Sequence, residues 1–303
     1  MKDTAGCILC VFHHGMTVIG EAAMKNWTIG ESEYPAERRG YFETIFTLCN
    51  GYMGIRGNLE GGGQSFMRGT FIAGVYDQGE APVEELVNCP HLSDLEIRID
   101  DEPVCIDDCT ILSHHRTLDM QRGYVTRDTV FADKGGRRLR LETKRLLSLC
   151  DPHLFVMEIR VTPMNFTSAI TIASGIDGSV RNTEKGTGKE NVHFTVASAL
   201  AEGDGGILRA VTLDKGIEIA SGAVLTPRNI GGYARQMSPA DDRVLGEIRY
   251  HAAEGVTAMI DKIVSTYTSR EVDDAAQAVR LHLEGNRRIP FDTHLETHAA
   301  VMR

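Results

Sequence analysis

The sequence lacks the positive charge that a nucleic-acid-binding protein needs. Its 303 residues carry a formal net charge of −10, with 32 Lys and Arg against 42 Asp and Glu. Phosphate binding requires a surplus of basic side chains on some face. The short basic run RRLR at 137–140 lies within an alternating, strand-like stretch and fits its solvated face. We therefore expect no nucleic-acid partner.

Long hydrophobic runs are also missing, since none approaches the roughly 20 residues of a membrane-spanning helix. The stretch CILCVF at 7–12 is too short, and too polar in its flanks, for a good secretory signal, although GEAA at 20–23 faintly resembles a cleavage region. The pattern of a folded domain begins at Met24. We expect residues 1–23 to lie outside the fold, and we expect no membrane partner.

Cysteine is sparse, with seven residues spread over the whole chain. An odd, thinly spread set is not a disulfide framework and suits a reducing compartment. The sequence thus predicts a cytoplasmic protein. The sequons at Asn26 and Asn165 would then have no role.

What the sequence does contain, from about 90 to 270, is an alternation of apolar and polar residues. LEIRID at 95–100 alternates in this way, DEP at 101–103 follows as a turn, and Val104 and Ile106 are predicted to begin the return strand. Many short strands without intervening helices favour an antiparallel sandwich. Further strands are predicted in RLRLETKRL (138–146), FVMEIRVTP (155–163), SAITIAS (168–174), VHFTVAS (192–198) and MIDKIVSTYTS (259–269).

The pattern changes to helical spacing near residue 270. Gly285 is placed to end the first helix. The two apolar stripes consist of Val272, Ala276, Val279 and Leu283, and of Phe291, Leu295, Ala299 and Met302.

Three motifs contain residues that can bind metal. In HLETH, His294 and His298 are four apart, but Glu296 does not directly follow the first histidine as the zincin pattern requires, so a solvated or inter-domain helix face fits better. The other two motifs lack the ligand spacing of structural zinc sites. They are CILCVFHH, with Cys7, Cys10, His13 and His14, and CIDDC (105–109), with His114 and His115. We therefore expect no metal.

No catalytic constellation is recognisable from residue chemistry alone. The glycine-rich stretches GGGQS (61–65) and GTGKE (186–190) do not match a P-loop and are predicted to be turns. A GxSxG nucleophile motif is absent. The acidic pairs are predicted to cap helices or occupy turns: Asp100–Asp101, Asp107–Asp108 and Asp273–Asp274.

NGYMGIRGN at 50–58 places three glycines in a segment that otherwise resembles a core strand. Such glycines indicate sharp bends or close packing. The segment lies within a longer stretch, 41–62, that resembles the N-terminal signature of glycoside hydrolase family 65, the maltose, trehalose and kojibiose phosphorylases and their relatives. The resemblance continues in family order through 69–77, 85–102, 118–131, 145–163, 176–182 and 263–270.

The resemblance implies an antiparallel β-super-sandwich at 24–270, of the galactose-mutarotase-like kind, and a helical linker at 271–303. The linker would lead to an (α/α)6 catalytic barrel that is absent here. The family's general acid, a glutamate, lies in that barrel, so no glutamate of this chain inherits the role. We expect the signature to be a turn of the sandwich, where Arg56, Asn58 and Glu60 contact the barrel or the rim of its sugar pocket.

For a complete member, the resemblance implies inverting phosphorolysis of an α-glucobiose to β-glucose 1-phosphate and glucose. Inorganic phosphate would be the co-substrate, without a cofactor, and a homodimer is possible. The chain alone is expected to be inactive. Two alternatives remain: a stand-alone carbohydrate-binding or scaffold module, and part of a trehalase-like hydrolase.

Overall fold

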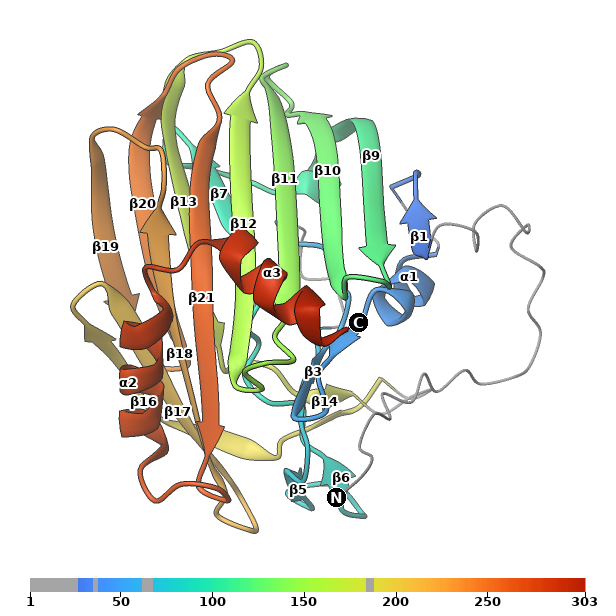
Figure 1. Cartoon of the computed structure of the whole chain (residues 1–303), viewed down its shortest axis with the longest axis vertical. Coiled ribbons are helices and arrows are strands. Elements are labelled where there is room, and N and C mark those ends of the chain that lie inside the picture. The colour runs from blue at the N-terminus through green and yellow to red at the C-terminus, as the bar shows by residue number, and fades with distance from the viewer. Residues whose placement is uncertain (1–26, 35–37, 62–67, 184–187, 303) are drawn as a thin grey trace.

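Two large antiparallel sheets form the molecule, which the computed structural model describes for residues 27–34, 38–61, 68–183 and 188–302. The larger has the order β1-β9-β10-β11-β12-β21-β18-β17-β16, and the smaller has the order β19-β20-β13-β7-β8 (Figure 1). The strands of the larger sheet are β1 (Thr28–Glu31), β9 (Thr110–Asp119), β10 (Tyr124–Ala132), β11 (Arg138–Leu147), β12 (Leu154–Pro163), β16 (Phe194–Glu202), β17 (Gly205–Thr212), β18 (Glu218–Pro227) and β21 (Ala258–Thr268). Those of the smaller sheet are β7 (Glu96–Ile99), β8 (Glu102–Val104), β13 (Ser168–Asp177), β19 (Tyr233–Pro239) and β20 (Arg243–Ala252).

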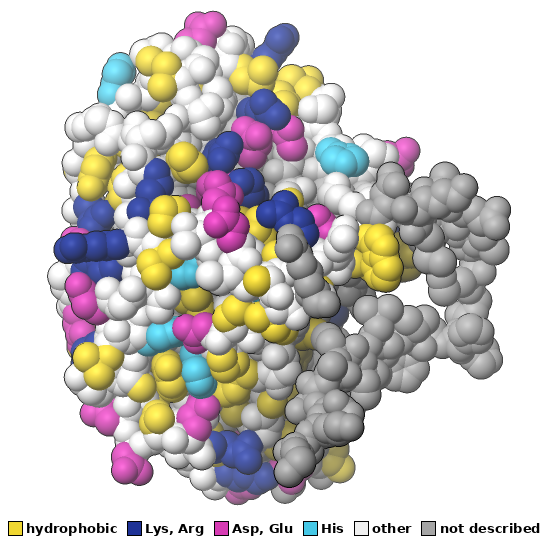
Figure 2. Space-filling model, in the orientation of Figure 1, with side chains coloured by type: hydrophobic (Ala, Val, Ile, Leu, Met, Phe, Trp, Pro, Cys, Tyr) yellow, Lys and Arg dark blue, Asp and Glu magenta, His cyan; other side chains and the backbone are white. Residues whose placement is uncertain are grey.

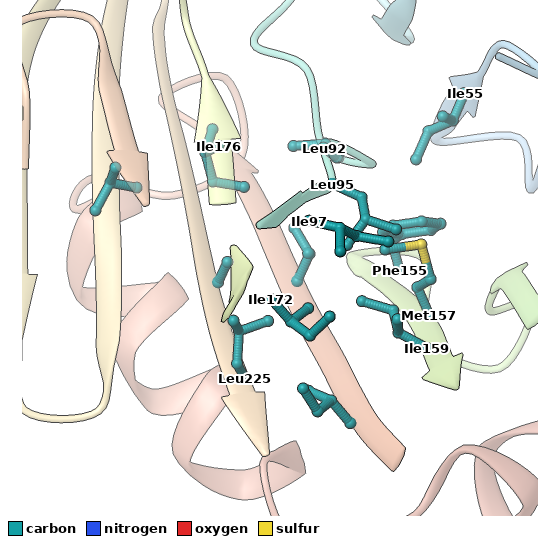
Figure 3. Packing of buried hydrophobic residues seen from close by; sticks show 14 of the residues in the cluster. Ile55, Leu92, Leu95, Ile97, Phe155, Met157, Ile159, Ile172, Ile176 and Leu225 are labelled. Atoms are coloured by element: carbon teal, nitrogen blue, oxygen red, sulfur yellow. The ribbon is translucent and has the colours of Figure 1, made fainter. Parts of the chain in front are cut away.

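Alternation along the strands creates the core between the two sheets. In β12, Phe155, Met157 and Ile159 point inward and are at most 1% exposed. Figure 3 shows them facing side chains of β7 and β13, among them Ile97 and Ile172. Alternate side chains of β12, among them Val156, are buried on the opposite face, so the strand is stabilised mainly by removing apolar area from water on both sides. The antiparallel sandwich expected from the sequence is confirmed.

The hairpin predicted at 95–106 is correct except at its end. Asp100 and Asp101 form the turn with positive φ angles of 52° and 67°, which aspartate tolerates better than most residues. The return strand β8 already begins at Glu102, within the predicted DEP turn. Ile106 is not part of that strand, because it begins the 3-10 helix η2 (Ile106–Asp108).

Short elements fill the ends of the sandwich. Helix α1 (Arg39–Ile45) precedes a small three-stranded sheet in which β3 is central. Two further pairs of two-residue strands complete the set. These elements are β2 (Leu48–Cys49), β3 (Met53–Ile55), β4 (Thr70–Ile72), β5 (Tyr76–Asp77), β6 (Glu85–Leu86), β14 (Asn182–Thr183) and β15 (Glu190–Asn191).

Two helices follow the last strand, as the sequence predicted. In α2 (Ala275–Asn286) the side chain of Asp274 caps the first turn by accepting a hydrogen bond from the Gln277 amide at 2.8 Å. Gly285 does not end this helix, which continues to Asn286 without a left-handed glycine cap. The second helix, α3 (Phe291–Val301), buries Phe291, Leu295 and Ala299, whereas Met302 lies beyond its end and is exposed.

Both helices pack on the outer face of the nine-stranded sheet (Figure 1). Their buried residues share a second apolar cluster with Leu146, Val156 and Ile263, which point away from the main core. The helices therefore cover the sheet, in addition to any linking role. Neither they nor any other described helix is long and apolar enough to span a membrane.

Candidate functional site

The turn that opens the signature segment is built by Asn50 and Gly51. The Asn50 side-chain oxygen accepts hydrogen bonds from the amides of Tyr52 and Met53 at 3.1 and 2.9 Å. Gly51 has φ of 89°, a conformation that other residues adopt only under strain. The turn joins β2 to β3, which fits the structural role expected for this stretch.

Beyond β3 the chain crosses the inner face of the nine-stranded sheet, where three arginines hold its backbone. Arg116 donates to the Gly57 carbonyl at 2.7 Å, and Arg145 donates to the Asn58 carbonyl at 2.9 Å. Arg127 donates to the carbonyl of Glu60 at 2.5 Å. Charged donors make stronger hydrogen bonds than neutral ones, so the segment is fixed at three points along its length.

The three arginines come from neighbouring strands and share one face. Arg116 of β9 stands directly opposite Arg127 of β10, and Arg145 of β11 stands opposite Val125 of β10. Their side chains are at most 2% exposed. Three adjacent buried cations would repel one another without nearby carboxylates.

Carboxylates supply that compensation. Glu60 lies 3.0 Å from Arg145 and 3.3 Å from Arg127, and Glu31 of β1 lies 2.6 Å from Arg116. We call Glu31, Glu60, Arg116, Arg127 and Arg145 the buried ion cluster. Burial by itself would raise the pKa of Glu60, but Arg145 and Arg127 outweigh it and lower that pKa. Glu60 is thus an ionised partner at neutral pH and is unsuited to act as a general acid.

Close packing explains a glycine at position 57. A β-carbon there would lie 2.7 Å from the Glu43 carbonyl oxygen and from atoms of Phe46. The ring of Phe46 in turn lies 4.1 Å from the Arg116 guanidinium, a cation–π contact. The segment can therefore approach α1 this closely only without a side chain.

The three residues singled out from the signature have different surroundings. Asn58 and Glu60 are each 3% exposed, whereas the Arg56 side chain is 25% exposed and pairs with Glu43 at 3.2 Å. Arg56 also lines a pocket. A contact of Arg56, Asn58 or Glu60 with another domain or with sugar stays a prediction.

That pocket has a volume of about 820 Å³ and lies where β4, β7 and β13 meet the segment. Ion pairs line it. Arg68 contacts Asp177 at 2.5 Å, and Arg243 contacts Asp94 at 2.6 Å and Glu96 at 2.7 Å. Burial alone would raise the pKa of Asp94, but His91, Arg68 and Arg243 lower it. We call Arg68, Asp94, Glu96, Asp177 and Arg243 the pocket ion pairs.

Buried polar groups connect the pocket to the signature segment. Ser93 lies 3.4 Å from both the Asn58 side-chain oxygen and the His91 ring. Burial lowers the pKa of His91 to about 4, so the ring is neutral at pH 7. Behind it, Lys262 donates to the Gly175 carbonyl at 2.7 Å, and burial lowers its pKa to about 7.

A third polar cluster ties the signature to α2. The hydroxyl of Tyr52 donates to Glu271, just ahead of the helix, and its ring lies 4.5 Å from that of His153. His282 of α2 lies 2.5 Å from Asp151 and 2.7 Å from Ser265. Figure 2 shows histidine and acidic side chains among hydrophobic ones on this face. These contacts fix the helix to the sheet, and because Ser265 is fully buried it offers no accessible nucleophile.

The motifs that contain possible metal ligands do not bring three or more such side chains together within the described residues. His294 and His298 are buried, and His298 accepts a hydrogen bond from the Leu149 amide at 3.1 Å. In CIDDC both cysteines are free thiols, and the nearby His114 pairs with Thr129. The motif at 7–14 lies outside the described residues, as do 62–65 of GGGQS and 186–187 of GTGKE.

The buried arginines and Lys262 were not predicted from the sequence. A signal was present, because Arg145 continues the inward series of Leu139, Leu141 and Thr143, and Arg127 lies between Val125 and Phe131 in the same way. A charge at an inward position of a strand indicates a buried partner.

Comparison with known proteins identifies a family that shares this architecture. The model of "Glycosyl hydrolase family 65, N-terminal domain" matches residues 29–303. A kojibiose phosphorylase from Caldanaerobacter subterraneus is 34% identical over 284 residues, covering 90% of this chain and 37% of the relative. One from Thermoanaerobacter brockii is 33% identical over 255 residues, covering 81% and 33%. An α,α-trehalose phosphorylase from the same species is 29% identical, covering 82% and 35%.

A solved structure shares the fold. A putative kojibiose phosphorylase from the human microbiome superposes with a TM-score of 0.80 over 92% of this chain and 38% of that one, at 15% identity. The chain thus spans about a third of the length of these relatives. The family match covers the signature, both sheets and both C-terminal helices. The chain therefore belongs to glycosyl hydrolase family 65, and it matches the N-terminal domain of that family.

Proposed function

We propose that this chain is the N-terminal domain of a disaccharide phosphorylase that cleaves an α-glucobiose with inorganic phosphate. The family match over 29–303, with kojibiose and trehalose phosphorylases among the relatives, carries the proposal. In the complete enzyme, a glutamate of the barrel would protonate the glycosidic oxygen while phosphate attacks the anomeric carbon. The products would be β-glucose 1-phosphate and glucose.

The chain by itself would supply structure and not chemistry. Glu60 of the signature segment is held ionised by Arg145 and Arg127, which is the opposite of what a general acid needs. Phosphate would bind as co-substrate to the barrel, without a metal or other cofactor. The isolated chain is therefore expected to be inactive.

The signature segment would act at the joint between domains. Arg56 keeps an accessible side chain, and it would contact the barrel or the rim of its sugar pocket. Asn58 and Glu60 would contribute to this contact by holding the segment in place. The sandwich would occupy 24–270, and 271–303 would lead toward the barrel. The enzyme would be cytoplasmic and would form a homodimer.

Phosphate dependence tests the proposal. Two proteins would be expressed: the 303-residue chain alone, and the longer product obtained when the reading frame is continued past Arg303. Each product is assayed with kojibiose, maltose and trehalose, with and without phosphate. We expect glucose 1-phosphate only from the longer product and only with phosphate. Phosphate-independent release of glucose would identify a hydrolase instead and would contradict the proposal.

A further inference from the structure

The pocket at the meeting point of β4, β7 and β13 shares Arg56 with the barrel contact proposed above, and its other lining residues are not used by the proposed reaction. Its volume of about 820 Å³ falls within the roughly 300–1,000 Å³ typical of small-molecule sites. Acidic, basic, amide and aromatic side chains all line it. A ligand of this pocket would be recognised by this domain alone, whether or not the proposed function is correct.

Charge pairing in the pocket disfavours a charged ligand. The guanidinium of Arg68 already contacts Asp177, and that of Arg243 contacts both Asp94 and Glu96. Arg56 is likewise paired with Glu43. An anionic ligand would compete with carboxylates for these cations, and a cationic ligand would compete with arginines for these carboxylates. A neutral ligand avoids both costs.

The same groups nevertheless keep free hydrogen-bonding capacity. Arg243 makes both of its bonds to carboxylates through Nη2, which leaves its Nε and Nη1 hydrogens outside them. Arg181 donates through Nη1 to the backbone carbonyls of Gly178 and Val180, and it forms no ion pair with a carboxylate of the described residues. Carboxylate oxygens accept more than one hydrogen bond each. The pocket therefore presents donors and acceptors side by side.

An alternating set of donors and acceptors matches hydroxyl groups, because each hydroxyl both donates and accepts. A ring carrying several hydroxyls can donate to a carboxylate and accept from the neighbouring guanidinium at the same time. An amide or a peptide offers fewer such combinations. The half-buried ring of Phe71 and the side chains of Val104 and Val180 supply apolar surface for the carbon–hydrogen face of such a ligand.

We propose that this pocket is a binding site for a neutral carbohydrate of one or two sugar units. The pocket ion pairs bind its hydroxyl groups, and Phe71 packs against its ring. The site belongs to the N-terminal domain itself and needs no residue of the barrel.

Titration calorimetry on the full 303-residue chain tests this site, with kojibiose, maltose, trehalose and, separately, inorganic phosphate as the probes. We expect at least one disaccharide to bind with a Kd in roughly the micromolar-to-millimolar range, and phosphate not to bind. Phe71→Ala should weaken binding about tenfold, because an aromatic contact is lost. Arg181→Ala should weaken it severalfold, and it serves as a second variant if Phe71→Ala fails to fold.

Arg98→Ala is the matched control. Arg98 also pairs with a carboxylate, Glu247, but it lines a separate hollow of about 320 Å³. This variant should bind sugar as the unchanged chain does. Absence of sugar binding by the folded chain would overturn the proposal, as would phosphate binding at the pocket or equal affinities for Arg181→Ala and Arg98→Ala. None of these results bears on phosphorolysis by the longer product.

Discussion

The buried ion cluster and the pocket ion pairs use the same kinds of side chain in opposite settings. In the first, the side chains of the arginines and glutamates are at most 2% exposed, and the arginines hold the backbone of the signature segment. In the second, the Arg68 and Arg243 side chains are 28% and 32% exposed and border a pocket. Asp94 and Asp177 of the pocket ion pairs are themselves buried, with side chains 8% and 3% exposed, so it is the burial of the arginines that separates a structural role from availability to a ligand.

The comparison also shows where the signature motif acts. Its backbone carbonyls, and not its side chains, receive most of the contacts from the arginines of β9, β10 and β11. A segment fixed in this way can present Arg56 at a constant position. Substitutions in the two clusters should therefore differ in how strongly they reduce stability.

Removing one buried arginine should have the largest effect. Arg145→Met leaves the charge of Glu60 with one partner fewer and the Asn58 carbonyl without its donor, so the free energy of unfolding should fall by about 3–5 kcal/mol. Urea denaturation followed by circular dichroism measures it. Arg249→Met is the control, since Arg249 forms an exposed pair with Asp101 and should leave the stability nearly unchanged. Equal effects would show that burial does not distinguish these pairs.

Gly57→Ala tests the close approach of the signature segment to α1. The added carbon would meet backbone atoms at 2.7 Å, and we expect a loss of about 1–3 kcal/mol. Gly231→Ala is the control, because a β-carbon there meets nothing within 4 Å. It should stay within about 0.5 kcal/mol of the unchanged chain in the same denaturation experiment. A neutral Gly57→Ala would mean that the segment is not tightly held.

Lys262 should make the free energy of unfolding depend on pH in the alkaline range. Its pKa of about 7 in the folded state lies below that of an unfolded lysine, about 10.4, so between these values only the unfolded state is protonated. Stability should therefore rise with pH, by about 1.4 kcal/mol per unit from this group. Comparing the chain with Lys262→Met at pH 8 and pH 9 isolates that slope. Parallel pH profiles would contradict it.

Arg243→Met should have the smallest effect on stability, because its side chain is about one-third exposed. We expect a loss of about 1 kcal/mol or less. Its effect should instead appear as weaker sugar binding. If Arg243→Met destabilised the chain as much as Arg145→Met does, the pocket ion pairs would be part of the structural framework.

How much the sequence predicts differs between the fold and the site. Alternation identified β7, β11 and β12, and helical spacing identified α2 and α3, because each pattern reflects burial within one element. The ends of elements were less predictable: Ile106 and Gly285 were misplaced, since their conformations depend on packing beyond the local pattern. The pocket could not be predicted, because its lining residues, such as Arg68, Asp177 and Arg243, come together only through the sheet topology.

The assignment of catalysis to the barrel is best tested by assaying the purified 303-residue chain with kojibiose, maltose or trehalose and inorganic phosphate. Sugar binding in the pocket is compatible with this assignment, because binding alone does not cleave a glycosidic bond. We predict that no glucose 1-phosphate is released above the level of a protein-free control. Release in proportion to the amount of folded chain would contradict the proposal that this domain does not carry the catalytic site.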